Sequence, residues 1–183
     1  MKIACLGWGS LIWRPKNLLI RREWFSDGPF LPIEFARQSQ DGRLTLVITE
    51  TAKPIRTLWA LMATENLATA KNSLLVREII PIKNLNGSIG SITSAEETED
   101  NVKLIIKEWA NRQGLDAVIW TNLTAKFGTD KREPNLMEAI DYLKSLDINK
   151  RSHAEEYIRR TPKQIDTDYR RNFEKEFGWT FVS

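Results

Sequence analysis

The stretch KIACLGWGSLIW, residues 2–13, decides how the rest of the chain is interpreted. Its first part, residues 2–6, is almost wholly apolar and predicts a β-strand. The turn Gly7-Trp8-Gly9-Ser10 follows at once. Two glycines around one aromatic residue let the backbone turn tightly, so that several N–H groups can converge on a carboxylate or an oxyanion. The stretch therefore predicts a first strand that leads into an anion-binding loop, and the alternative is a tight turn without a ligand.

The two common nucleotide-binding motifs do not fit this loop. A dinucleotide-binding motif needs a third glycine and a helix that opens directly after it, whereas residues 11–15 read LIWRP and start no obvious helix. The lysine of a phosphate-binding P-loop is also missing after the glycines.

The sequence GWGSLIW, residues 7–13, resembles the Tyr-Gly-Ser-Leu loop of the γ-glutamylcyclotransferase-like superfamily, which is often extended to Tyr-Gly-Ser-Leu-Ile-Trp in its glutathione-degrading branch. Trp8 replaces the tyrosine. The resemblance implies an α+β fold with a small mixed, barrel-like β-sheet and flanking helices. It also implies cyclisation of a γ-glutamyl amino acid, peptide or amine to 5-oxoproline with release of the amine and no metal or cofactor. The implied substrate-holding residues are Gly7, Trp8, Gly9, Ser10 and Leu11.

A second segment, residues 35–43, resembles the family more loosely. The alternating runs 31–36 and 44–48 flank the turn Gln40-Asp41-Gly42 and predict a β-hairpin. An arginine and a serine precede the second strand in the family, so the resemblance adds Arg37 and Ser39 as candidate substrate-binding residues. The alternative places both on the rim of a surface hairpin.

The candidate acid/base is Glu78. After a strand over residues 56–62 and a short helix over 65–75, the apolar run 76–82 reads as a further strand that carries this glutamate. The family has a strand, a short helix and a catalytic glutamate in the same order, and the position of its usual glycine after the glutamate is occupied by Ile79. We expect Val76, Ile80 and Ile82 to surround Glu78 and disfavour its charge. The alternative is a salt-bridged glutamate at a strand end.

Length and patterning predict one domain, residues 1–183, with a mixed α/β core over 1–130 and a helical C-terminal extension over 131–183. The tetrads Ser94–Glu97, Ser152–Glu155 and Thr161–Gln164 match capping boxes and predict three helix starts. Ile165, Tyr169, Phe173 and Phe177 recur every four residues up to Gly178, which predicts a helix with one face packed on the sheet.

Charge and cysteine content argue against several classes of function. The net charge of +3 is spread over arginine pairs such as 21–22, 159–160 and 170–171 that have acidic neighbours, so we expect a mixed-charge surface and no nucleic-acid partner. One cysteine, Cys5, and one histidine, His153, provide neither a disulfide framework nor a Cys/His zinc site. The absence of a long apolar run or a signal pattern predicts a soluble, cytoplasmic protein without membrane association, and leaves its oligomeric state open.

Three other functions stay open. A nucleic-acid binder would need its scattered arginines to lie on one face of the molecule. A non-catalytic small-molecule or anion-binding module would keep the glycine loop but hold Glu78 in solvent or in an ion pair, for example with Arg77. A hydrolase would use another carboxylate, Glu34 or Glu50.

Overall fold

The computed structural model describes residues 1–21 and 23–183, so Arg22, the second member of the first arginine pair, lies outside the described residues. The chain divides into two compact units. Unit 1 comprises residues 1–7, 14–31 and 56–123, and unit 2 comprises residues 8–13, 32–55 and 124–183. The predicted single domain over 1–183 stays a prediction.

Unit 1 is built on a four-stranded mixed sheet in the order β5-β1-β7-β6. Strand β1 pairs antiparallel with β5 and parallel with β7, and β7 pairs antiparallel with β6. The predicted first strand is confirmed, because all five residues of β1 are buried. The bounds of the four strands are β1 Ile3–Gly7, β5 Leu58–Leu61, β6 Ile89–Thr93 and β7 Ala117–Thr121.

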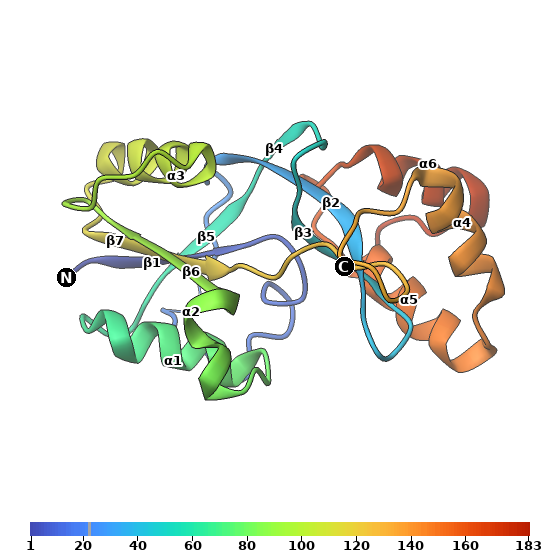
Figure 1. Cartoon of the computed structure of the whole chain (residues 1–183), viewed down its shortest axis with the longest axis horizontal. Helices are drawn as coiled ribbons and strands as arrows, with labels where there is room; N and C mark the ends of the chain where they lie inside the picture. Colours follow the sequence, from blue (N-terminus) through green and yellow to red (C-terminus); the bar gives the residue numbers. More distant parts are fainter. Residues whose placement is uncertain (22) are drawn as a thin grey trace. The chain divides into compact units, whose positions relative to one another are not determined.

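Helices α1, Leu67–Arg77, and α3, Asn101–Arg112, lie on opposite faces of this sheet (Figure 1). The side chain of Asn66 caps α1, and Asp100 caps α3. The helix predicted over 65–75 is thus confirmed, whereas the Ser94–Glu97 capping box is wrong, since α3 starts seven residues after Ser94. After α1 come a 3₁₀ helix, Ile82–Asn84, and the short helix α2, Leu85–Ser88.

Unit 2 contains most of a three-stranded sheet in the order β3-β2-β4. The predicted hairpin is confirmed: β2, Phe30–Gln38, pairs antiparallel with β3, Leu44–Ile48, with a bulge between Phe35 and Arg37. Strand β4 spans Pro54–Arg56. In the described part of the chain, the strands form these two open sheets and no closed barrel.

Three helices of the C-terminal region complete unit 2 (Figure 1): α4, Leu136–Ser145, α5, Ile148–Arg160, and α6, Asp168–Phe177. Phe35 of β2 meets Tyr157 of α5 and Phe173 of α6 edge to face. The capping boxes at Ser152 and Thr161 are wrong, because Asp147 already caps α5 and Thr161 ends that helix. Thr167 caps α6, which ends at Gly178 in the left-handed conformation, as its apolar spacing predicts.

The α+β class is therefore confirmed. Over residues 1–21 and 23–183, no helix combines the length and the apolar character that crossing a membrane requires.

Candidate functional site

The glycine loop leaves β1 and turns at once. Gly7 is the last residue of β1 and pairs with Leu58, so it belongs to unit 1, whereas Trp8 to Leu11 belong to unit 2. The N–H of Ile12 donates to the carbonyl of Gly9 at 3.0 Å, which closes a turn over residues 9–12. The predicted turn after the first strand is thus confirmed, and its binding of an anion stays a prediction.

Trp8 anchors the loop to the neighbouring hairpin. The indole is buried, and its Nε1–H donates to the carbonyl of Leu46 in β3 at 3.1 Å. A buried indole needs a partner for its N–H, and this one finds it on a strand. Trp8, which replaces the tyrosine of the family motif, therefore fixes the loop to β3.

A residue that the sequence did not indicate also contacts the loop. Tyr157 projects from α5, and its hydroxyl lies against Gly9, where a Cβ would collide with it. The same hydroxyl accepts the N–H of Leu46 at 3.3 Å. No local pattern links Gly9 to a tyrosine so far along the chain, and only the folded arrangement of α5 and β3 reveals the contact.

Arg37 and Ser39 are both engaged within unit 2. The Arg37 guanidinium donates to the carbonyl of Thr124 at 2.7 Å. The single proton of the Ser39 hydroxyl is shared between the Asp41 carboxylate and the carbonyl of Arg43 across the hairpin turn. Burial alone would raise the pKa of Asp41, but hydrogen bonds from Arg43 and Ser39 outweigh it and hold that pKa below its usual value. These contacts are those of a hairpin rim, the alternative that the sequence left open.

Glu78 lies at the C-terminal end of α1, and the strand predicted over residues 76–82 is wrong. The helix continues to Arg77, and the backbone N–H of Glu78 caps it. The side chains of Val76 and Ile82 are exposed to solvent, so the expected apolar surroundings of Glu78 are wrong as well. The run is apolar in sequence, but it follows the end of a helix at the surface.

An arginine holds the Glu78 side chain, which is 20% exposed. Nη1 of Arg77 donates to Oε1 of Glu78 at 2.8 Å. Arg77 is itself buried and donates from Nη2 and Nε to the carbonyl of Arg14, at 2.8 and 3.3 Å. Within unit 1, Arg77 therefore links the carboxylate of Glu78 to the backbone of Arg14.

The charge of Glu78 also affects Cys5 of β1. The pKa of the Cys5 thiol is raised to about 12, chiefly by burial and also by the charge of Glu78, against the opposing charge of Arg77. Within unit 1, the charge of Glu78 therefore acts on the first strand.

The residue after Glu78 has an unusual backbone. Ile79 has a φ of +57°, in the left-handed region that favours glycine, although its side chain is β-branched. Its side chain is 80% exposed, so packing does not compensate for the unfavourable conformation. Strain of this kind costs about 1–3 kcal/mol and is concentrated at functional sites.

Replacing Ile79 with glycine should raise the free energy of unfolding by about 1 kcal/mol, because glycine adopts this conformation freely and little buried surface is lost. Urea unfolding followed by circular dichroism measures the change. Ile82→Gly is the matched control: Ile82 is exposed but has no positive φ, so the same substitution should destabilise. Equal effects of the two substitutions would show that Ile79 is not strained.

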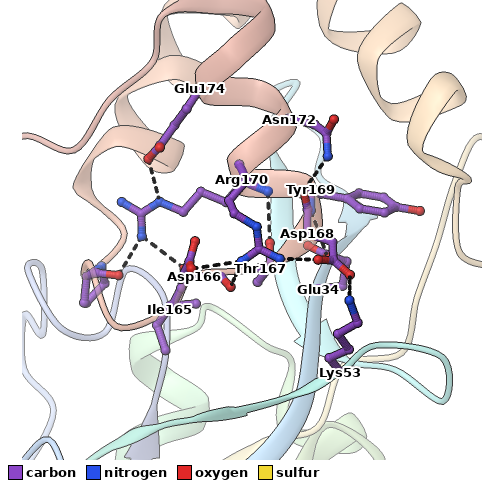
Figure 2. Close-up of polar contacts among 12 residues, drawn as sticks. Glu34, Lys53, Ile165, Asp166, Thr167, Asp168, Tyr169, Arg170, Asn172 and Glu174 are labelled. Atoms are coloured by element: carbon purple, nitrogen blue, oxygen red, sulfur yellow. Dashed lines mark hydrogen bonds and ion pairs between the residues drawn. The ribbon is translucent and has the colours of Figure 1, made fainter.

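Glu34, the alternative catalytic carboxylate, is buried in unit 2 at the start of α6 (Figure 2). It accepts the backbone N–H of Tyr169 at 3.2 Å and that of Phe35 at 2.9 Å, and it hydrogen-bonds to the side chain of Thr167. Burial raises its pKa, these hydrogen bonds lower it in part, and Asp168 adds to the rise. Its described contacts are those of a carboxylate that stabilises the N-terminus of a helix. Glu50, in contrast, is exposed.

The raised pKa of Glu34 predicts a pH dependence of stability. Between the usual value of 4.5 and the higher value in the folded state, the folded chain binds more protons than the unfolded one, so stability falls as the pH rises through this window. Glu34→Gln should remove this contribution, which amounts to at most about 1.4 kcal/mol per pH unit. Urea midpoints measured from pH 4.5 to 7.5 test the slope. The exposed control Glu50→Gln should keep the wild-type slope, and an unchanged slope in Glu34→Gln would contradict the assignment.

Charged side chains elsewhere are largely paired. Arg159 and Arg160 pair with Glu155 and Glu156 along α5, and Arg171 pairs with Asp166 and Asp168. Among the described residues, no three His, Cys, Asp or Glu side chains gather as a metal site would require.

The structure thus places Gly7 and Glu78 in unit 1, and Trp8, Gly9, Ser10, Leu11, Arg37 and Ser39 in unit 2. Comparison of the chain with models of protein families, with curated proteins and with solved structures found no match.

Proposed function

We propose that the chain is a γ-glutamylcyclotransferase-like enzyme, which converts a γ-glutamyl amino acid, peptide or amine to 5-oxoproline and a free amine, with Glu78 as the general acid/base. The proposal includes membership of that superfamily and its type of α+β fold. It starts from the resemblance of residues 7–13 to the family's loop.

The left-handed backbone of Ile79 is the observation that carries the proposal. The family's motif has a glycine after its catalytic glutamate, and at the matching position this chain adopts the conformation for which glycine is suited. A β-branched residue in that conformation is unfavourable, so its presence directly after Glu78 supports the residue-by-residue match. The location of Glu78 close to β1, through its interaction with Cys5, agrees with this match.

The proposed reaction needs no covalent intermediate with the protein. The substrate's α-amine attacks its own γ-carbonyl, a five-membered ring closes, and the C–N bond to the leaving amine breaks. Holding amine and carbonyl in the reactive alignment can supply several kcal/mol of the barrier. The backbone amides of the loop would hold the substrate's carboxylate or the developing oxyanion.

Glu78 would remove the proton from the substrate's ammonium group and return it to the leaving nitrogen. Its partial exposure leaves the carboxylate accessible to a substrate, and the hydrogen bond from Arg77 fixes its orientation. Because Arg77 is anchored on the carbonyl of Arg14, the carboxylate would keep its place through both proton transfers.

The Arg77–Glu78 ion pair also favours a second candidate, a non-catalytic anion-binding module of the same fold. In that protein the carboxylate would be permanently occupied by the 2.8 Å contact and the glycine loop would act alone.

The two candidates are separated by incubating the purified chain with glutathione, γ-glutamyl amino acids and γ-glutamyl amines. Release of 5-oxoproline, measured by chromatography, is expected from at least one of them. Binding of a γ-glutamyl compound in calorimetry without turnover of any substrate would favour the binding module.

A further inference from the structure

We infer that Tyr157, on α5, is a positioning residue of the substrate-holding loop, and that the C-terminal helical region is thereby part of the binding site. The inference rests on the proposed function and deepens it. It assigns to Tyr157 the task of fixing the backbone at Trp8 and Gly9, whose amides would hold the substrate.

Four residues of unit 2 form a closed ring of contacts, which we call the Tyr157 clasp: Trp8, Gly9, Leu46 and Tyr157. Trp8 donates its indole N–H to the carbonyl of Leu46 at 3.1 Å. Leu46 donates its own N–H to the Tyr157 hydroxyl at 3.3 Å. That hydroxyl then lies against Gly9, with Cζ of the ring 3.3 Å from the place of a Cβ, and Gly9 is bonded to Trp8. The carbonyl and the N–H of one strand residue, Leu46, thus hold the loop, through Trp8 and through Tyr157.

The tyrosine that closes the clasp is itself immobilised. Its ring is buried and meets Trp13 edge to face at a centroid distance of 5.5 Å and Phe35 at 6.3 Å. The guanidinium of Arg43 lies 5.4 Å from the ring centroid. A ring packed in this way cannot swing aside, so a side chain at position 9 would have to displace the loop backbone.

Displacing that backbone should affect substrate binding more than chemistry. Of the two groups that the loop amides would hold, we assign to them the substrate carboxylate, which is present in the ground state and in the transition state alike. Loss of such uniform binding raises KM while leaving kcat unchanged. General destabilisation of the fold has the opposite signature, because it lowers the active fraction, and hence the apparent kcat, at constant KM.

The first test is Tyr157→Phe, which keeps the ring and removes only the hydroxyl. With the γ-glutamyl compound that the wild type converts best, we expect KM to rise about fivefold and kcat to stay within about twofold. Tyr142→Phe is the matched control, because it too removes a phenol hydroxyl that hydrogen-bonds to the backbone of the hairpin, here by donating to the carbonyl of Gly42 at 3.0 Å. We expect Tyr142→Phe to leave KM at the wild-type value.

The second test is a double-mutant cycle between positions 9 and 157. Gly9→Ala should raise KM at least about tenfold and lower the urea midpoint, because the new Cβ collides with the hydroxyl. In the Tyr157→Phe background the nearest ring atom is Cζ, 3.3 Å from the new Cβ, so the same substitution should raise KM by less than half the factor and shift the midpoint by less than half as much.

The outcomes separate the inference from the proposed function. An active wild type with additive effects in the cycle, or with an unchanged KM in Tyr157→Phe, overturns the role of Tyr157 and leaves the proposed function standing. A wild type that releases 5-oxoproline from none of the γ-glutamyl compounds overturns the proposed function, and the positioning role falls with it. Non-additive effects in the cycle together with a raised KM in Tyr157→Phe support both the positioning role of Tyr157 and the proposed function.

Discussion

Glu78→Gln is expected to lower kcat for 5-oxoproline release by about 1000-fold, the range in which general acid/base catalysis contributes. Glutamine has nearly the same shape as glutamate, and its carbonyl oxygen can still accept the hydrogen bond from Arg77. The variant should therefore fold like the wild type but be unable to take the proton from the substrate's ammonium group. Single-turnover release of 5-oxoproline from the best γ-glutamyl substrate measures the effect on the chemical step.

The control for this experiment is Glu96→Gln, which alters another partly exposed glutamate of unit 1 that pairs with a basic side chain, Lys103. It should retain wild-type kcat. Glu78→Asp keeps the carboxylate but shortens its reach, and an activity between those of wild type and Glu78→Gln is expected. Wild-type turnover by Glu78→Gln would show that another group moves the protons.

The largest effect on stability is expected at Arg170, on the first turn of α6 (Figure 2). Its side chain is only 3% exposed, and it donates to the carbonyls of Pro162 and Ile165 at 2.6 and 3.1 Å and to Glu174 at 3.2 Å. Arg170→Met would leave buried acceptors without a donor. We expect it to lower the free energy of unfolding by about 3 kcal/mol, measured by urea denaturation.

The neighbouring Arg171 provides a matched control. It is 48% exposed and pairs with Asp166 and Asp168 at the surface, so Arg171→Met should cost no more than about 1 kcal/mol. Arg170→Lys retains a positive charge but has fewer donors, so its loss of unfolding free energy should lie between those of Arg170→Met and Arg171→Met. If Arg170→Met and Arg171→Met unfold at the same urea concentration, the buried hydrogen bonds of Arg170 contribute little to stability.

The elements that follow from local patterns were predictable. Alternation over residues 31–36 and 44–48 gave the hairpin β2–β3, and helical spacing over 65–75 gave α1. The segment after α1 was mispredicted, because an apolar run near a helix end has the same composition as a buried strand. In the structure Arg77 donates to the carbonyl of Arg14, a contact between distant parts of the sequence that no local pattern indicates.

The predicted helix starts were wrong for a related reason. A tetrad such as Ser152–Glu155 satisfies the capping pattern, but Asp147 had already started α5 five residues earlier. Capping patterns describe one turn of chain and do not exclude a competing start nearby. Within the candidate site, the glycine turn was visible in the sequence, whereas the tyrosine of α5 that contacts it depends on how β3 and α5 pack.

The burial of Cys5 gives unit 1 an internal reporter. The chain has a single cysteine, which is fully buried and whose thiol pKa is about 12. A thiol-reactive dye can therefore label the native protein only after β1 becomes accessible. The labelling rate in the absence of denaturant therefore measures how often this strand opens, at one defined position beside Glu78. Combined with a γ-glutamyl ligand, the same rate would reveal whether occupancy of the site slows opening of the strand that leads into the glycine loop.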